Sequence, residues 1–469
     1  MVGAQSKQPG EARLALDLWR AQREGAVGLA RRQEHRLADL VAHARSASPF
    51  YQRLYGDLPA EGVALRDLPP VTKPQLMAAF DDWVTDPGVT RAGVEAFVAD
   101  SARVGSPYHG DLFVCTSSGT TGHPGLFVHD RGAVAVYRAL SVVRIDFAWL
   151  SMGDWLHAVR RGVRWAAVMG TGGHFMGAGW MELERRRSGW RSRAYRVFSV
   201  QRPVAELVAE LDAFDPTFIT GYPSALELLA EEQTAGRLHL RPVLVETGGE
   251  STAPDARARM AAAFGCVIHN AYGASEFLSL AASCPHDWLH VNSDWVILEP
   301  VDEDFRPTSP GRPSHTVLLT NLANRIQPVI RYDLGDSVLA RPDPCPCGSP
   351  LPAIQVAGRR DDVLRLAAAD GRTVSLLPLA IGAVVEETLG VRRSQLVQTG
   401  PATIRLRLEA EPDVDVERMW RDVTANLSAY LAEQRLANVD LVRASEAPEQ
   451  SAHSGKFRQV IAGASGASQ

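Results

Sequence analysis

The residues best suited to chemistry lie in the stretch TSSGTTGHPG, at residues 116–125, which holds three glycines, three threonines and two serines. Glycine lets the backbone approach an anion and turn its N–H groups inward, and hydroxyl groups add donors without bulk. It is not a Walker loop, because no Gly-Lys-Ser/Thr follows. The stretch is therefore a candidate phosphate-binding loop. An ordinary surface loop would have the same composition, so other motifs must support this interpretation.

Cysteine and histidine gather in two later segments, CPHDWLH at residues 284–290 and CPCG at residues 345–348. A Cys-x-Cys turn followed by glycine can aim two sulfur atoms at one point. The predicted ligands are Cys284, His290, Cys345 and Cys347, a Cys₃His set typical of structural zinc. His286 is a competing ligand, and unrelated cysteines are the alternative interpretation. The other cysteines, at positions 115 and 266, are expected to be small core residues.

Short apolar runs flank the Ser/Thr/Gly loop and predict a strand on each side of it. Farther along, residues 215–233 predict a strand, a tight turn and a helix capped by Ser224, residues 241–251 a strand and loop, and residues 266–276 the same pattern again. Helical apolar spacing also runs from about residue 12 to 44. Repeated strand, glycine loop and helix indicate an α/β architecture with ligand loops at the strand ends.

The pattern changes near Gly358, after which a strand (402–410), an amphipathic helix (414–433) and a strand (438–443) form a small α+β unit. We therefore expect two domains. Residues 1–360 would bind ATP and the acid, and residues 361–469 would form a small mobile domain.

Composition excludes several classes of function. The 469 residues are 45% hydrophobic and 22% charged, and the net charge of −5 gives no reason to expect a nucleic-acid or membrane partner. No uncharged apolar run reaches the ~18 residues of a membrane span. Five cysteines in so long a chain do not make a disulfide scaffold, and the N-terminus has no signal-peptide pattern. A cytoplasmic enzyme is expected.

Four further stretches follow the loop in order: NAYGASE (270–276), RYDLGD (331–336), GRRDD (358–362) and SGKFRQVI (454–461). Together the five motifs resemble the adenylate-forming superfamily of acyl-CoA synthetases, adenylation domains and luciferases. PVIRYDLGD and the cysteine pattern are most similar to the phenylacetate-CoA ligase family, some of whose members carry such a zinc site. The resemblance implies a large N-terminal domain with mixed β-sheets flanked by helices, plus a small C-terminal α+β domain.

The resemblance also implies a role for each motif residue. The β- and γ-phosphates of ATP would be held by Thr116, Ser117, Ser118, Gly119, Thr120, Thr121 and Gly122, with Thr121 also catalytic. Adenine would lie against Gly248, Gly249, Glu250, Ala271, Tyr272 and Gly273, with Tyr272 stacked on the base.

The remaining roles concern charge and domain movement. Glu276 would bind Mg²⁺, and Asp336 with Arg359 would contact the ribose. Lys456 would bridge the acid carboxylate and the α-phosphate, where charge develops. Asp361 would be the hinge.

The acid pocket would be built from three strand-end loops, at residues 170–180, 220–224 and 269–275. Its expected residues are His174, Phe175, Tyr222, Tyr272 and Gly273. The aromatic rings could wall a flat aromatic acid, and His174 could pair with a ring hydroxyl or the carboxylate. The alternative interpretation is that each of these aromatic residues simply packs in the core.

Two positions depart from the family pattern. His123 stands where the family has lysine in the phosphate loop, which predicts weaker or more pH-sensitive triphosphate binding. Residues 367–378 differ from the segment that helps form the coenzyme A tunnel, which leaves the second nucleophile open.

The predicted function is ATP-dependent activation of an aromatic carboxylic acid to an acyl-adenylate with release of pyrophosphate, then transfer to coenzyme A. Expected cofactors are ATP, Mg²⁺, structural Zn²⁺ and coenzyme A. One alternative passes the adenylate to an amine, a carrier protein or a small nucleophile such as nitrite. Others are a catalytically inactive zinc-containing nucleotide-binding protein and a phosphotransferase that releases ADP. Assembly as a homodimer stays open.

Overall fold

The structure is a computed structural model of the whole chain, and it describes residues 10–59, 62–117, 125–146, 148–249, 254–356, 364–376, 378–411, 413–449 and 459–462. No helix within these ranges is both long enough and apolar enough to cross a membrane.

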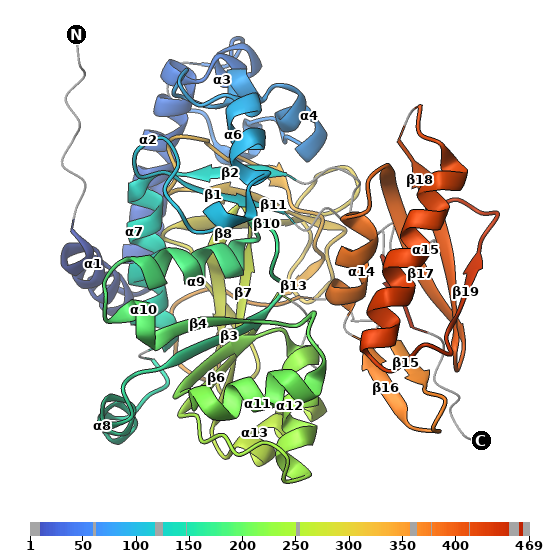
Figure 1. Cartoon of the computed structure of the whole chain (residues 1–469). Helices are drawn as coiled ribbons and strands as arrows, with labels where there is room; N and C mark the ends of the chain where they lie inside the picture. Colours follow the sequence, from blue (N-terminus) through green and yellow to red (C-terminus); the bar gives the residue numbers. More distant parts are fainter. Residues whose placement is uncertain are drawn as a thin grey trace.

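A layer of helices makes up most of the first hundred residues (Figure 1). They are α1 (Glu11–Arg23), α2 (Gly25–Ala47), α3 (Pro49–Leu54), α4 (Lys73–Ala78), α5 (Phe80–Trp83) and α6 (Arg91–Val98). The helical pattern predicted between residues 12 and 44 is thus divided in two. The division falls at Gly25, whose φ of 70° is a conformation that suits glycine.

A nine-stranded mixed sheet forms the centre of the large domain (Figure 1). In spatial order its strands are β13 (Val338–Ala340), β14 (Ala353–Val356), β9 (Leu289–Val291), β8 (Phe277–Ser283), β7 (Val267–Ala274), β6 (Leu244–Gly248), β5 (Phe218–Gly221), β3 (Trp165–Met169) and β4 (Tyr195–Ser199). The strands from β4 to β7 pair in parallel, and those from β7 to β13 pair antiparallel. This arrangement confirms the predicted mixed α/β class.

Helices connect the parallel strands. They are α9 (Met176–Arg186), α10 (Arg191–Ala194), α11 (Val204–Phe214), α12 (Pro223–Thr234) and α13 (Pro254–Phe264). The predicted strand, turn and helix at residues 215–233 is present as β5 and α12. The predicted cap at Ser224 is wrong: Tyr222 is the N-cap and Pro223 the first helical residue. Proline suits that position because its missing N–H would have no partner there.

The strand and loop predicted at residues 266–276 are present, but the expectation that a helix follows each glycine loop is wrong here. β7 runs through Ala274 and returns as strand β8. A Cβ atom at Gly273 would lie 2.0 Å from the carbonyl oxygen of Leu278. Glycine therefore allows the two strands to meet where a side chain would force them apart.

Smaller elements stand beside the large sheet. The strands expected on both sides of the Ser/Thr/Gly loop form the antiparallel pair β1 (Phe113–Thr116) and β2 (Leu126–His129). After them come α7 (Arg131–Leu140), a π-helix (Ser141–Asp146) and α8 (Met152–Arg160). A three-stranded sheet contains β10 (Val296–Val301), β11 (Thr316–Asn321) and β12 (Tyr332–Asp333).

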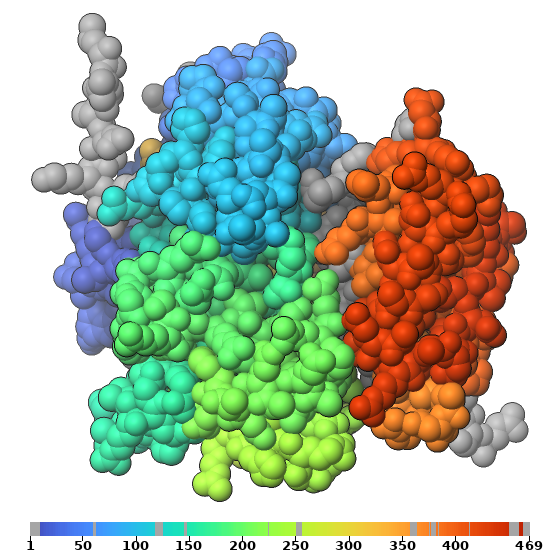
Figure 2. Space-filling model, viewed as in Figure 1, coloured from blue at the N-terminus to red at the C-terminus, as the bar shows by residue number. Residues whose placement is uncertain are grey.

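The C-terminal residues form a separate smaller lobe, orange and red in Figure 2. Its four-stranded sheet has the order β19 (Asp440–Arg443), β18 (Thr403–Ala410), β17 (Val391–Gly400) and β20 (Val460–Ile461). The other elements are β15 (Leu364–Ala367), β16 (Thr373–Leu376), α14 (Pro378–Glu386) and α15 (Val416–Glu433). The strand, helix and strand expected after residue 401 are present, and the predicted boundary at residues 360 and 361 lies outside the described residues.

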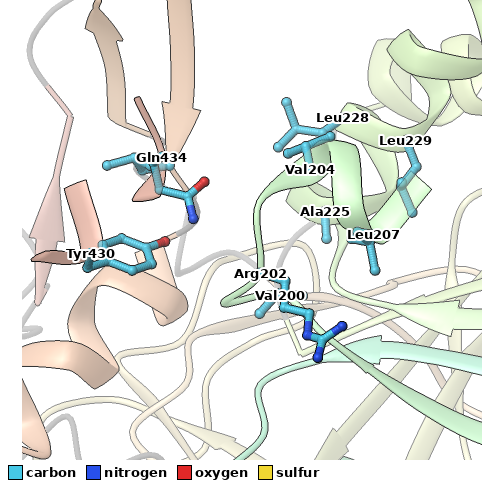
Figure 3. Close-up of a pocket in the computed structure, with 10 residues that line it drawn as sticks. Val200, Arg202, Val204, Leu207, Ala225, Leu228, Leu229, Tyr430 and Gln434 are labelled. Carbon is cyan, nitrogen blue, oxygen red and sulfur yellow. The ribbon is translucent and has the colours of Figure 1, made fainter. Parts of the chain in front are cut away.

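A groove lies at the junction of the two lobes and is lined by both of them (Figure 3). Val204, Leu207 and Leu228 line it from α11 and α12, and Tyr430 and Gln434 line it from the C-terminal lobe. The large lobe therefore meets the small one here partly through apolar side chains.

Candidate active site

The two ends of the candidate phosphate loop are held together at Ser117. Its N–H donates to the carbonyl of Gly125 at 2.9 Å, and its hydroxyl accepts from the Gly125 N–H at 2.7 Å. On the other side, the Thr116 N–H donates to the carbonyl of His174 at 2.7 Å. The loop thus begins and ends at a fixed base on β1 and β2. Residues 118–122, to which phosphate contacts were assigned, lie outside the described residues.

A cation that the sequence analysis missed lies at this base. The Nζ atom of Lys73, the first residue of α4, donates to the Ser117 hydroxyl oxygen at 3.0 Å. Gly125 leaves room for the approach, since a Cβ there would lie 3.1 Å from Cε of Lys73. Lys73 precedes the loop by 44 residues. The only available signal was a lysine beside Thr72 and Pro74 at a helix start, and that signal does not name a phosphate site.

Glu276 is buried close to the base of the loop, with 6% of the residue exposed. Burial raises the pKa of its carboxyl group. A hydrogen bond from the Tyr332 hydroxyl and the charge of Lys73 lower that pKa, whereas Asp336 raises it. A buried carboxylate that is influenced by the charges of a cation and of a second carboxylate can contribute to a divalent-ion site.

Tyr272 and Asp336 are brought together from motifs 64 residues apart. The Tyr272 hydroxyl donates to Oδ2 of Asp336 at 2.8 Å. Gly248 at the end of β6 pairs with Ala271 on β7, so the residues predicted to hold adenine and ribose lie at neighbouring strand ends. Arg331, from the same motif as Asp336, is buried and forms an ion pair with Glu299 at 3.1 Å.

Two aromatic residues predicted to wall the acid pocket do face the same space. A Cβ atom at Gly170 would lie 3.6 Å from the Tyr222 hydroxyl and 3.9 Å from the Phe175 ring. A Cβ atom at Gly249 would lie 3.0 Å from the Tyr222 ring. Glycine at positions 170 and 249 therefore keeps the space beside these rings open.

His174 is directed toward the helical layer. Its Nε2 atom lies 3.1 Å from the carbonyl oxygen of Asp100, and its ring centroid lies 5.2 Å from that of Phe97. Burial lowers its pKa, so the ring is neutral at neutral pH. Its predicted contact with the acid stays a prediction.

The small lobe also approaches this region. A Cβ atom at Gly172 would lie 3.4 Å from Oε1 of Glu387, just after α14. The predicted site residues Glu250, Arg359, Asp361 and Lys456 lie outside the described residues.

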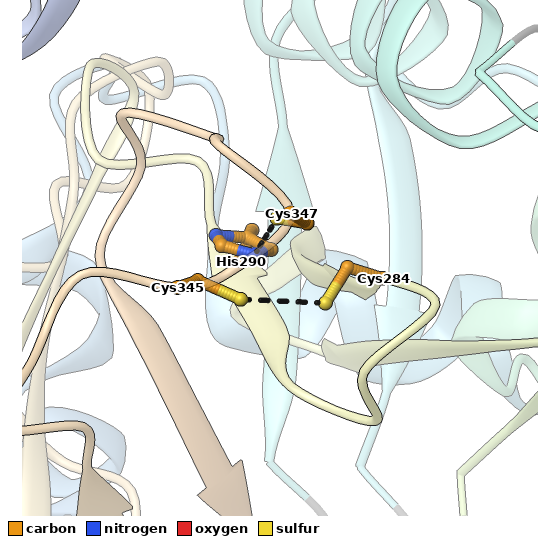
Figure 4. Close-up of side chains that lie close together, drawn as sticks. All are labelled: Cys284, His290, Cys345 and Cys347. Carbon is orange, nitrogen blue, oxygen red and sulfur yellow. Dashed lines mark hydrogen bonds between the residues drawn. The ribbon is translucent and has the colours of Figure 1, made fainter.

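The four predicted metal ligands form one cluster where β8 ends, β9 begins and the chain approaches β14 (Figure 4). Their ligand atoms all lie within 4.8 Å of one another. Sγ of Cys284 is 3.7 Å from Sγ of Cys345, and Sγ of Cys347 is 3.1 Å from Nε2 of His290. Nδ1 of His290 lies 2.9 Å from the carbonyl oxygen of Leu351, which leaves Nε2 directed into the cluster.

The family model of the AMP-binding enzymes matches residues 30–318, more than half of the chain. The chain belongs to the AMP-binding enzyme family. This confirms the predicted adenylate-forming superfamily and the predicted enzyme class, an AMP-forming acid ligase. A search of curated proteins finds no significant match.

Solved structures are similar to this AMP-binding enzyme over most of its length. A 2-hydroxyisobutyryl-CoA ligase with 2-HIB-AMP and CoA in the thioesterification state is 23% identical, with a TM-score of 0.54 over 92% of this chain and 88% of that chain. The same ligase in an open conformation is 22% identical, with a TM-score of 0.50 over 91% of this chain and 90% of that chain. The amide bond synthetase McbA from Marinactinospora thermotolerans is 17% identical, with a TM-score of 0.41 over 74% of this chain and 67% of that chain. The first two similarities show a shared fold.

Proposed function

We propose that this enzyme activates an aromatic carboxylic acid with ATP, forming an acyl-adenylate and pyrophosphate, and then transfers the acyl group to coenzyme A. The observation that carries the proposal is the contact of Lys73 Nζ with the Ser117 hydroxyl, 3.0 Å away at the base of the Ser/Thr/Gly loop. The charges of Lys73 and Asp336 both act on the buried carboxyl group of Glu276, and the neighbouring Ser275 hydroxyl donates to the carbonyl of Thr116 at 3.2 Å. Such a set suits a triphosphate and its metal ion better than an uncharged ligand.

In this proposal each residue acts on a different part of ATP and the acid. Lys73 offsets charge on the phosphates, as a preorganised cation does where charge develops. Asp336, held by Tyr272, accepts hydrogen bonds from the ribose hydroxyls, and Phe175 and Tyr222 wall the acid. Lys456 and Arg359 keep the roles that the family resemblance implies. A bound Mg²⁺, held by Glu276, would supply further charge neutralisation.

We also propose that Cys284, His290, Cys345 and Cys347 hold one structural zinc ion. Two sulfur atoms that are each ~2.3 Å from a tetrahedral ion lie about 3.8 Å apart, and the Cys284 and Cys345 sulfur atoms are separated by 3.7 Å. The carbonyl of Leu351 would accept from Nδ1–H of His290 and fix its orientation, as outer partners of zinc-binding histidines do. Four protein ligands leave no open position for catalysis.

Acid-dependent exchange of labelled pyrophosphate into ATP tests this proposal. Exchange should require both an aryl acid and Mg²⁺, and Glu276→Gln should abolish it while the variant still folds. A second incubation with coenzyme A, an amine or nitrite, followed by mass spectrometry, would identify the acceptor. Exchange that persists in Glu276→Gln at the wild-type rate would contradict the assigned role of Glu276.

A further inference from the structure

Three polar side chains form a row across the parallel part of the large sheet. Thr220 on β5 pairs with Glu246 on β6, and Glu246 pairs with His269 on β7. Side chains of paired residues on neighbouring strands point to the same face of a sheet. The Thr220 hydroxyl donates to Oε1 of Glu246 at 3.0 Å, which shows that the row is in contact.

The row lies on the face that carries the candidate active site. Two residues farther along the chain are Gly248 on β6, Ala271 on β7 and Tyr222, which follows β5 in an extended conformation; all three belong to the predicted acid and adenine walls. A period of two keeps them on the face of Thr220, Glu246 and His269, roughly 7 Å closer to the strand ends. The opposite face is apolar: Ile219, Val245 and Ile268 pack in the core with residues of α12 and α13.

One buried polar atom of the row has no hydrogen-bond partner among the described residues. Nε2 of His269 is buried with no hydrogen-bond partner among them. It lies 3.8 Å from Oε2 of Glu246, too far for a hydrogen bond. The other ring nitrogen, Nδ1, lies 3.1 Å from the Ser283 hydroxyl. A buried polar atom without a partner costs free energy, so this arrangement calls for a ligand.

Solvent reaches the Glu246 end of the row and not the His269 end. The His269 side chain is fully buried, whereas that of Glu246 is 18% exposed. The ring of Trp149 lies over His269, with a centroid distance of 5.4 Å. Burial raises the pKa of Glu246 to about 7, whereas it lowers that of His269 to about 3, so the histidine is neutral at neutral pH.

We propose that Glu246 and His269 recognise a neutral N–H or O–H group on the acid, on the part of the molecule farthest from its carboxylate. The carboxylate of Glu246 accepts from that group, and Nε2 of His269 makes the second hydrogen bond. The tautomer set by Ser283 decides whether Nε2 donates, which suits a phenol, or accepts, which suits an arylamine. This inference rests on the proposed function and names its substrate class: hydroxy- or amino-substituted aryl acids.

Such a site discriminates mainly by leaving its own groups unpaired when the wrong acid binds. An acid with a methyl group in place of the amine or hydroxyl would cover Oε2 of Glu246 and Nε2 of His269 without giving either atom a partner. The expected loss in binding is roughly 10- to 100-fold.

The test measures binding and adenylation in parallel, on benzoic acids that carry an amino, hydroxyl, methyl or no substituent at each ring position. Calorimetry gives binding, and pyrophosphate exchange gives adenylation. The variants are Glu246→Met and the milder Glu246→Gln. Glu184→Gln is the control, because Glu184 is another buried carboxylate, paired with Arg138 and Arg187 away from the row.

We expect the wild type and Glu184→Gln to bind one donor-bearing acid at least about tenfold more tightly than its methyl analogue. In Glu246→Met that ratio should fall to about one or invert. Equal binding of both acids by the wild type, or an unchanged ratio in a folded Glu246 variant, would overturn the inference. Donor preference in binding without any pyrophosphate exchange would overturn the proposed function and leave the recognition site standing.

Discussion

The Nζ atom of Lys73 lies 3.0 Å from the hydroxyl oxygen of Ser117, although 44 residues separate them in the sequence. Ser117 belongs to the predicted phosphate loop and is its last described residue before position 125; in this loop His123 stands where the family resemblance implies lysine. The position of Lys73 therefore supplies a cation that the loop itself lacks.

Replacing Lys73 should weaken ATP use more than acid binding. Lys73→Met removes the charge at the loop base, so we expect KM for ATP to rise and exchange to fall by roughly 10- to 100-fold. Steady-state exchange at varied ATP and acid concentrations separates the two effects. Arg66→Ala, which removes an exposed charge elsewhere, is the control. Equal increases in KM for ATP and for the acid would argue against a phosphate role.

Removal of one zinc ligand should destabilise the fold more than it slows the chemistry. Elemental analysis of protein purified without chelators should give one zinc per chain. Cys347→Ser should lose the metal and lower the melting temperature, because the proposed ion would join the loop after β8 to the turn before β14. Cys266→Ser, a cysteine outside the cluster, should keep the zinc. Wild-type protein that contains no zinc and melts at the same temperature as Cys347→Ser would refute the site.

Gly273 should tolerate no side chain. Gly273→Ala would place a Cβ atom 2.0 Å from a backbone oxygen, at the tight junction of β7 and β8. We expect a loss of more than about 3 kcal/mol in the free energy of unfolding. Gly189→Ala is the control, since a Cβ there meets nothing within 4 Å. Urea denaturation of both variants gives the comparison, and equal stability of the two would show that the hairpin opens freely.

Glu246 should make stability depend on pH. Its pKa is about 7 in the folded protein and about 4.5 in an unfolded chain, so the unfolded state ionises first as pH rises. Below pH 4.5 the carboxyl is protonated in both states and costs nothing. Between pH 4.5 and 7 the folded state loses stability, and above pH 7 the full cost is present. His269 stays neutral over this range because burial and, among the described residues, the charge of Arg257 both lower its pKa.

Glu246→Gln should therefore raise the melting temperature relative to the wild type, and by more at pH 8 than at pH 5. Differential scanning fluorimetry over this range measures the difference. A gain that is constant with pH would mean that the Glu246 carboxyl ionises normally.

Local patterns predicted much of the fold. The apolar runs at β1, β2 and β18 and the amphipathic face of α15 specify their own structure, because strand and helix periodicity is a local property. The end of β7 could not be predicted in the same way. Gly273 followed by Glu276 fits either a helix start or a tight hairpin, and the close approach of Leu278 decides between them only in three dimensions.

The site shows the same limit. Tyr272 and Asp336 were found through their motifs, and the structure joins them by a hydrogen bond. Lys73 belongs to no motif considered in the sequence, and Glu246 and His269 lie within the segments 241–251 and 269–275 without a role assigned to either of them. A polar residue within a strand such as VLVETGG has no visible partner until strand order places Thr220 on one side of it and His269 on the other.

The nucleotide product is the measurement that tests the central claim most directly. Purified enzyme, ATP, Mg²⁺ and an aryl acid are incubated without an acceptor, and the products are separated by anion-exchange chromatography. The assigned site predicts cleavage between the α- and β-phosphates, so acyl-adenylate and pyrophosphate should appear in equal amounts and only when the acid is present, with AMP formed as water hydrolyses the adenylate. Formation of ADP and phosphate in place of AMP and pyrophosphate would contradict the account.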